Sequence, residues 1–245
     1  MTTDGPASAE ASTEGETYIT SDLHLGSPYS HYENFLAWLD LVPAGARLVL
    51  NGDIIDDPKN PLPPAHRAVV DRLVEESHRR PLVWVYGNHD RSFRIDDPGA
   101  IEFASEWRVD TRLLVKHGDS LDEVMPRHNV FKDVFKFMHR VMIFCGFPDV
   151  HVAQYAKKWN FLYRVLNEHV AEKAAKLAAE RGMAAITCGH THAAMDIERS
   201  SDGRAVRYLN TGAWTEKPHY YVKVDAAGVH LCSYAGVPAA EAGGA

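Results

Sequence analysis

The sequence predicts an α/β protein, because short apolar runs that indicate buried strands alternate with segments of helical periodicity. Each of these runs ends in a polar or glycine-rich turn, as buried strands commonly do. They occupy residues 17–20, 47–50, 82–86, 113–115 and 184–187. Helical patterns at 31–41 and 65–79 separate the early runs, and further strands are expected at 205–209, 220–224 and 228–234.

The length of 245 residues suits one compact domain that carries an insertion. We expect a disordered tail at residues 1–16, which are small, polar and acidic, and a flexible Gly/Ala tail at 236–245. The domain between them, 17–235, is interrupted by a helical insert at about 126–181. A Gly-Phe-Pro break at 146–148 divides the insert, and its second helical run extends from about 150 to 181.

The insert is basic in a chain that is otherwise acidic. It holds ten Lys and Arg against five Asp and Glu, whereas the whole chain has a net charge of −7. Its first helix places Phe135 on an apolar face and Lys132, Lys136 and Arg140 on another. These four residues are candidates for contact with an anion or a membrane surface. The alternative is a plain amphipathic helix packed on the core.

Other bulk features indicate a cytoplasmic protein. No apolar stretch approaches the ~20 residues that span a bilayer. The three cysteines are scattered and lack the spacing of zinc or redox motifs, which makes a disulfide framework improbable. The core supplies no basic surface of the kind that nucleic-acid binding needs, so no nucleic-acid partner is expected.

Five polar clusters stand directly after predicted strands, at the edge where open α/β sheets bind ligands. They are Asp22-Leu23-His24, Asn51-Gly52-Asp53 with Asp56, Gly87-Asn88-His89-Asp90, His117-Gly118-Asp119 and Gly189-His190-Thr191-His192. Alternate side chains of an extended segment project to the same side, so an Asp-x-His or His-x-His pair can hold one ion. Each cluster alone is compatible with an ordinary turn, but all five in this position favour a metal site.

The order of these motifs resembles the calcineurin-like metallophosphoesterase superfamily, from Tyr18 to about Tyr234. The resemblance implies a two-sheet β-sandwich flanked by helices, with two divalent ions bound at one edge. It makes Asp22, His24, Asp53 and His192 ligands of one ion, and Asp53, Asn88, His117 and His190 ligands of the other. Two neighbouring metal ions of this kind hydrolyse phosphoesters by activating a water molecule. The oxygen and nitrogen ligands favour Mn²⁺, with Fe or Zn²⁺ as alternatives.

The resemblance also implies roles for residues that are not ligands. His89 is expected to contact the phosphate or to assist the leaving group. Asp56 and Asp90 are expected to orient the ligands, and Asp119 is a weaker candidate for this role.

Narrower motifs are similar to the bacterial UDP-2,3-diacylglucosamine diphosphatases of lipid A synthesis. The shared segments are 21–25, 117–121, 189–192 and 210–214. The insert stands where that family has its lid, which makes Lys132, Phe135, Lys136 and Arg140 candidates for a substrate lid. This implies a lipid-nucleotide substrate and peripheral contact with the inner membrane. His89 departs from the family, which has arginine at this position, and favours a general phosphatase or phosphodiesterase acting on protein or soluble nucleotides. A non-catalytic scaffold is a remote third hypothesis.

Overall fold

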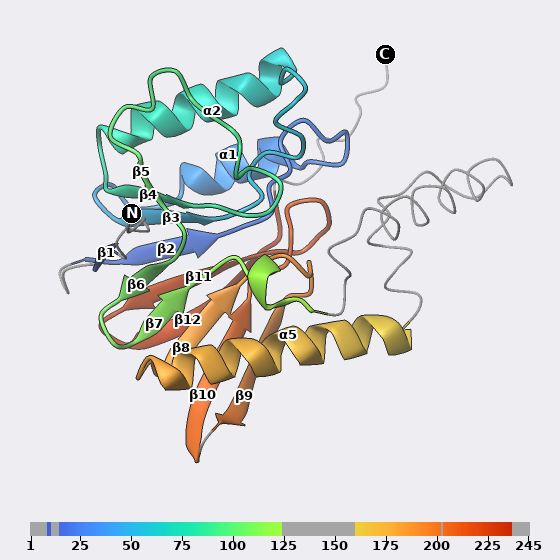
Figure 1. Ribbon diagram of the computed structural model, residues 1–245. Coiled ribbons are helices and arrows are strands. Elements are labelled where there is room, and N and C mark those ends of the chain that lie inside the picture. The colour runs from blue at the N-terminus through green and yellow to red at the C-terminus, as the bar shows by residue number, and fades with distance from the viewer. Residues whose placement is uncertain (1–8, 11–14, 124–159, 202, 237–245) are drawn as a thin grey trace, which may run out of the picture.

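The computed structural model describes residues 9–10, 15–123, 160–201 and 203–236, and these residues form two six-stranded mixed sheets with helices outside them (Figure 1). The strand order is β12-β11-β2-β3-β4-β5 in one sheet and β1-β6-β7-β8-β10-β9 in the other. The two-sheet α/β architecture predicted from the sequence is therefore confirmed.

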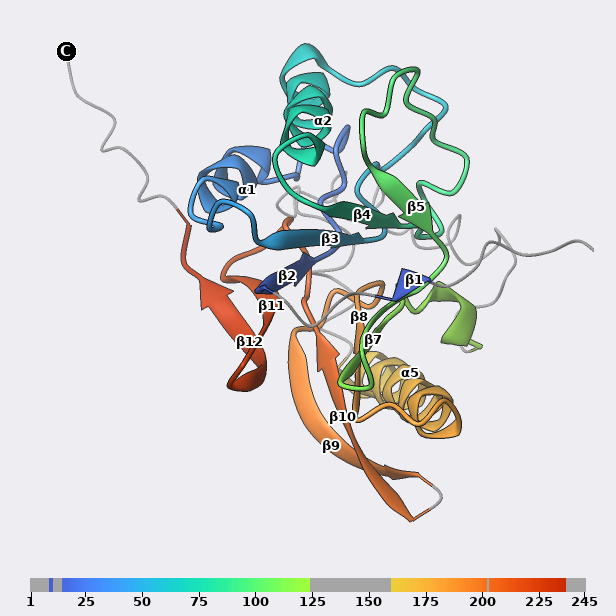
Figure 2. The same cartoon turned by 90° about the vertical axis from the view of Figure 1, so that its left-hand side faces the viewer.

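The first sheet carries two helices on its outer face (Figure 2). Its strands are β2 (Thr17–Thr20), β3 (Arg47–Asn51), β4 (Leu82–Val85), β5 (Glu102–Ala104), β11 (His219–Asp225) and β12 (Gly228–Tyr234). The helices are α1 (Tyr32–Leu39) and α2 (Pro64–Ser77).

The second sheet carries the long helix α5 (Asn160–Glu180) on its outer face (Figure 2). Its strands are β1 (Ala9–Glu10), β6 (Trp107–Val109), β7 (Leu113–Val115), β8 (Ala185–Cys188), β9 (Met195–Ser201) and β10 (Arg204–Asn210). A short 3₁₀ turn, η1 (Asp119–Leu121), follows β7.

Side-chain alternation along the strands divides the core into three layers. In β3, Val49 faces the second sheet, whereas Leu48 and Leu50 pack with α1 and α2. In β7, Leu113 faces the first sheet and Leu114 packs against α5. Both faces of these central strands are buried, which explains why the sequence shows them as continuous apolar runs.

The predicted strands and the two early helices are confirmed to within a few residues. The structure adds β5, β6 and β9, which the sequence did not indicate. Strands β5 and β6 are three residues long and include a charged residue, unlike the equally short but wholly apolar β7, and β9 is a polar edge strand. Ala9–Glu10 pairs with β6 inside the segment predicted as a tail. The helical prediction at 150–181 is confirmed for α5. The rest of the insert, with Lys132, Phe135, Lys136 and Arg140, lies outside the described residues.

Parallel pairing brings the functional loops to one edge. Strands β2, β3 and β4 run parallel with Thr20 beside Leu50 and Leu50 beside Trp84, so all three end at the same level. In the other sheet β7, β8 and β10 are also parallel neighbours. None of the helices within the described ranges is long and apolar enough to cross a membrane.

Candidate metal centre

The backbone is unusual where the polar clusters leave the strands. Six non-glycine residues of the described chain have positive φ, and five of them are candidate ligands. These five are Asp22 (55°), His24 (50°), Asp53 (52°), His190 (65°) and His192 (55°). Left-handed backbone costs an L-residue roughly 1 kcal/mol. Conformations of this kind cluster at functional sites, where the surrounding fold maintains them.

Hydrogen bonds between neighbouring loops hold these conformations. The N–H of Asp22 donates to the carbonyl of Gly52 at 3.0 Å, and the N–H of His24 donates to the carbonyl of Asp53 at 3.0 Å. The N–H of Trp214 donates to the carbonyl of Asp22 at 2.9 Å. The loops after β2 and β3 therefore position each other, and the segment after β10 fixes them from the other side.

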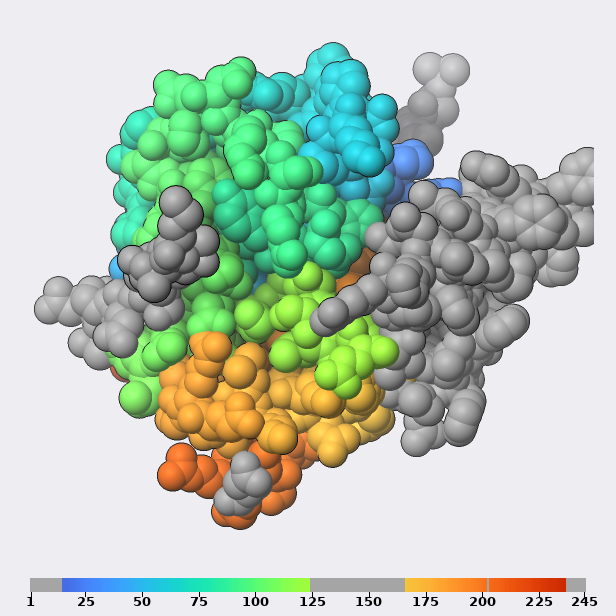
Figure 3. All heavy atoms as spheres, viewed as in Figure 1, coloured from blue at the N-terminus to red at the C-terminus, as the bar shows by residue number. Residues whose placement is uncertain are grey.

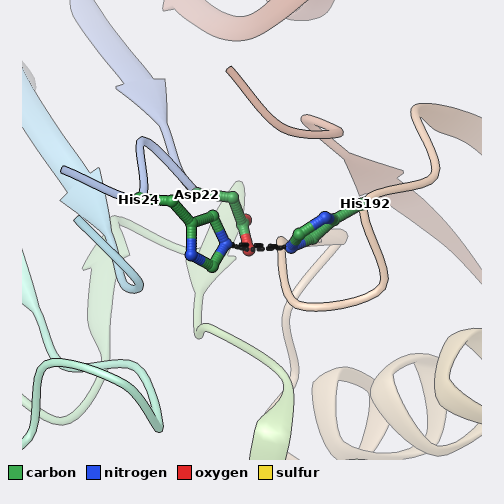
Figure 4. A group of neighbouring side chains, drawn as sticks. All are labelled: Asp22, His24 and His192. Atoms are coloured by element: carbon green, nitrogen blue, oxygen red, sulfur yellow. Dashed lines mark hydrogen bonds and ion pairs between the residues drawn. The ribbon is translucent and has the colours of Figure 1, made fainter. Parts of the chain in front are cut away.

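Asp22, His24 and His192 form the first ligand cluster (Figure 4). Both imidazoles point toward the buried Asp22 carboxylate, with Oδ1 at 3.8 Å from Nε2 of His24 and 3.3 Å from Nε2 of His192. The two Nε2 atoms are 3.0 Å apart. Ligand atoms about 2.1 Å from a common ion lie roughly 3 Å from one another. The spacing of these three side chains fits ligands of one cation.

Asp53, His117 and His190 form the second cluster. Oδ2 of Asp53 lies 3.2 Å from Nε2 of His117, and Oδ1 of Asn88 lies 3.0 Å from Nδ1 of His190. Nδ1 of His117 donates to the carbonyl of Asn51 at 2.8 Å, which directs Nε2 at the cluster. Apart from the Asp53 carboxylate, this buried Nε2 has no hydrogen-bond partner among the described residues, as expected for an atom that binds a metal.

The clusters adjoin each other. The N–H of His190 in the second cluster lies 3.2 Å from both carboxylate oxygens of Asp22 in the first. Gly87 and Gly189 allow this close approach, because a Cβ at Gly87 would overlap the Asp53 carboxylate and one at Gly189 would overlap that of Asp22. The residues present therefore fit a pair of neighbouring cations.

Electrostatics in the cluster favour added positive charge. Burial lowers the pKa of His24 and His117, but neighbouring carboxylates outweigh burial and raise the pKa of each to about 10. Burial opposes ionisation of Asp22 and Asp53, yet the histidines hold the pKa of both carboxyls below the ordinary value. His192 differs, since burial lowers its pKa. Divalent ions would replace the protons that His24 and His117 hold.

Residues 16–194 match the family model described as calcineurin-like phosphoesterase, which is more than half of the chain. The chain belongs to the calcineurin-like phosphoesterase family. It is therefore a metal-dependent hydrolase of phosphoester bonds, and its Asp and His clusters are consistent with a dinuclear metal site.

Solved structures similar to this phosphoesterase have low sequence identity to it. Yfce, a phosphoesterase from E. coli, has 17% identity, covers 91% of this chain and 100% of its own, and gives a TM-score of 0.45. A protein serine/threonine phosphatase from Saccharomyces cerevisiae has 10% identity and a TM-score of 0.49; the match covers 97% of this chain and 86% of the phosphatase chain. Pseudomonas putida nuclease MPE has 16% identity and a TM-score of 0.42; the match covers 88% of this chain and 87% of the nuclease chain. No curated protein sequence gives a significant match.

His89 lies beside the first cluster of this phosphoesterase. Its ring meets that of His24 edge to face, with centroids 5.2 Å apart. The backbone N–H of His89 donates to Oδ1 of Asp53 at 2.8 Å, and the ring Nδ1 donates to the carbonyl of Asp56 at 2.6 Å. Nε2 is then the atom available to a substrate. His24, Asp56 and His89 also form a third group with potential ligand spacing.

Asp56 and Asp90 support the site in different ways. Oδ1 of Asp56 accepts a hydrogen bond from Nδ1 of His24 at 2.9 Å and so orients a candidate ligand directly. Asp90 is fully buried and accepts bonds from the N–H groups of Ile54 and Gly87 and from Nε1 of Trp84. It therefore holds the backbone next to Asp53 and Asn88, and within the described part of the chain its bonds reach no candidate ligand side chain.

Asp119, the weaker candidate for orienting a ligand, pairs with Arg91 at 3.0 Å. Sequence reasoning gave no role to Ser21, whose hydroxyl donates to Asp22 and lies 2.6 Å from the hydroxyl of Thr211. It also missed Asp122, which contacts His190. Serine and aspartate in turns carry no distinctive signal, so these roles depend on the tertiary contacts.

Proposed function

We propose that this phosphoesterase hydrolyses phosphoester or pyrophosphate bonds with two divalent cations, preferentially Mn²⁺. Asp22, His24 and His192 would hold one ion, and His117, His190 and Asn88 the other. Asp53 would bridge them. The observation that carries this proposal is the pair of adjoining clusters, in which ligand atoms face each other at 3.0–3.8 Å. When bound, such a pair polarises the phosphoryl oxygens and lowers the pKa of water to near neutrality.

The protein groups around the clusters would bind and orient the phosphate. The Asp56 carbonyl accepts the Nδ1–H of His89, so Nε2 faces outward as the second ring nitrogen. In the imidazolium form Nε2–H would donate a hydrogen bond to a phosphoryl or leaving-group oxygen. The backbone N–H of His89 donates to the Asp53 carboxylate at the same time, which ties the His89 backbone to the proposed bridging residue. Substrate orientation would then depend on a backbone contact that mutation of Asp56 does not remove.

For the substrate, our first candidate is UDP-2,3-diacylglucosamine or a related lipid-linked diphosphate. Its support is the similarity of residues 21–25, 117–121, 189–192 and 210–214 to the diphosphatases of lipid A synthesis, together with a basic insert in the corresponding place. Under this hypothesis the protein acts in the cytoplasm at the surface of the inner membrane. The candidate lid residues Lys132, Phe135, Lys136 and Arg140, which lie outside the described residues, would contact the acyl chains and the diphosphate.

A general phosphatase or phosphodiesterase is the second candidate, and His89 favours it. The diphosphatases carry arginine here, whereas this chain has an imidazole anchored through Nδ1 to the Asp56 carbonyl. A protein phosphoester or a soluble nucleotide would then be the substrate.

A substrate panel tests the class of reaction and the substrate together. Purified protein with Mn²⁺ is offered an aryl phosphomonoester, an aryl phosphodiester, a phosphopeptide and the UDP-linked lipid. Hydrolysis of at least one, lost in Asp53→Ala and His190→Ala, supports the proposal. Asp71→Asn serves as a matched control, because Asp71 is an exposed partner of Arg67. Metal-loaded protein that is inert toward all four would contradict the proposal, and release of UMP would identify the lipid substrate.

A further inference from the structure

Asp122 contacts the outer edge of a candidate ligand. Its Oδ2 lies 2.9 Å from Nε2 of His190, and the side chains are 2% and 17% exposed, respectively. The other ring nitrogen, Nδ1, lies 3.0 Å from Oδ1 of Asn88. The imidazole of His190 is therefore held between a carboxylate and the amide oxygen of another candidate ligand.

This arrangement has a chemical consequence for His190. A carboxylate accepts hydrogen bonds only, so the Asp122 contact requires a proton on Nε2 of His190. Nδ1 is then the nitrogen whose lone pair can bind an ion. A carboxylate behind a ligand imidazole also makes the binding nitrogen more basic. Asp122 itself belongs to none of the ligand groups found within the described chain, whereas His190 belongs to one of them.

The loop that carries Asp122 explains how it reaches this place. It begins at His117, turns at Gly118, whose φ is 112°, and passes through η1 before Asp122. A Cβ at Gly118 would lie 3.3 Å from Cβ of Cys188 and 3.7 Å from Cβ of His190, so the loop is packed closely on β8 and the turn after it. In the space-filling view this loop, in yellow-green, lies directly above α5 (Figure 3). One loop thus brings both His117 and Asp122 to the second cluster.

We propose that Asp122 is a positioning residue that fixes the ring and tautomer of His190 and thereby sets the affinity of the second cation, the one shared by Asp53, Asn88, His117 and His190. This inference rests on the proposed two-cation function. It predicts an effect on one ion of the pair, because the ligand that Asp122 contacts belongs to the second cluster.

Calorimetric titration of metal-free protein with Mn²⁺ and Zn²⁺ tests the proposal without an activity measurement. The wild type should bind two ions. Asp122→Ala should bind one of them 10- to 100-fold more weakly and leave the other unchanged. Asp122→Asn keeps an acceptor oxygen without the charge, so it should restore part of the lost affinity. In Zn²⁺-loaded protein labelled with ¹⁵N-histidine, the Nε2–H resonance of His190 should move upfield in Asp122→Asn.

Glu123→Gln is the matched control, because Glu123 is the next residue and pairs with Lys173 of α5 at 3.0 Å. It should leave both affinities unchanged. The role of Asp122 would be overturned if Asp122→Ala lowered the affinity for both ions equally or changed neither affinity. It would also be overturned if Glu123→Gln lost the same affinity. Failure of the wild type to bind two ions would instead contradict the proposed function itself, so the two failures are distinguishable.

Discussion

Nδ1 of His24 donates a hydrogen bond to Oδ1 of Asp56 at 2.9 Å, while the carbonyl of the same Asp56 accepts one from His89. One residue thus orients a candidate metal ligand through its side chain and a candidate proton donor through its backbone. The Asp56 carboxylate also lies 3.9 Å from Nδ1 of His89, but a side-chain substitution leaves the shorter carbonyl contact in place.

Asp56→Asn should therefore lower the affinity for the ion proposed to bind Asp22, His24 and His192 by about 10- to 100-fold. At saturating Mn²⁺, kcat should recover most of its wild-type value, because the backbone contact with His89 persists. Activity measured as a function of Mn²⁺ concentration checks this. A loss of kcat that excess Mn²⁺ does not restore would show that the Asp56 side chain has a further role.

Gly87→Ala should abolish metal binding and hydrolysis, because the added Cβ would overlap both the carboxylate and the backbone nitrogen of Asp53. Gly45→Ala provides the comparison. Gly45 has φ of 83°, and a Cβ added there would meet no described atom within 4 Å beyond its chain neighbours. This substitution should cost about 1 kcal/mol of stability and leave activity intact. Metal titration and activity assays of the two variants separate a local clash from backbone strain.

Glu76→Gln should lower the free energy of unfolding at pH 7 by about 3 kcal/mol, because it leaves a buried guanidinium without its charge partner. The Glu76 and Arg80 side chains are 2% and 8% exposed, and their charged groups are 2.7 Å apart. Asp71→Asn breaks the exposed pair with Arg67 and should cost under about 1 kcal/mol. Urea unfolding of the three proteins measures the difference.

The effect of Glu76→Gln should also depend on pH. Burial opposes ionisation, but Arg72 and Arg80 outweigh it and lower the pKa of Glu76 from 4.5. A lowered carboxyl pKa contributes stability that is complete above the unfolded value and is lost as pH falls through the folded value. The difference in the free energy of unfolding between wild type and Glu76→Gln should stay constant from pH 7 to about 5 and become smaller below pH 4.5. If this difference grew in acid, the ion pairs of Glu76 would not be its cause.

Removal of divalent ions with a chelator should lower the thermal unfolding midpoint, and added Mn²⁺ should restore it, since ligands that bind only the folded state stabilise it. In Asp53→Asn this response should disappear, because a carboxylate at the junction of the clusters is lost. Differential scanning calorimetry with and without Mn²⁺ provides the measurement. Equal responses in the two proteins would mean that the stabilising ion binds elsewhere.

The sequence by itself determined the fold class, most strands and the candidate residues of the metal centre. Buried parallel strands must be apolar on both faces, which made β2, β3 and β4 visible as runs. Imidazole and carboxylate groups immediately after such runs are chemically distinctive, which made the clusters around Asp22, Asp53 and His190 visible as well.

Only the tertiary structure decided how these groups are oriented. The short strands β5 and β6 and the polar edge strand β9 form through pairing with neighbours rather than through a local pattern. The contact of Asp122 with His190 spans 68 positions, and Asp90 acts on the backbone beside the ligands rather than on the ligands themselves. The residue types at a site follow from its chemistry, but hydrogen-bond partners depend on which loops the packing of two sheets brings together.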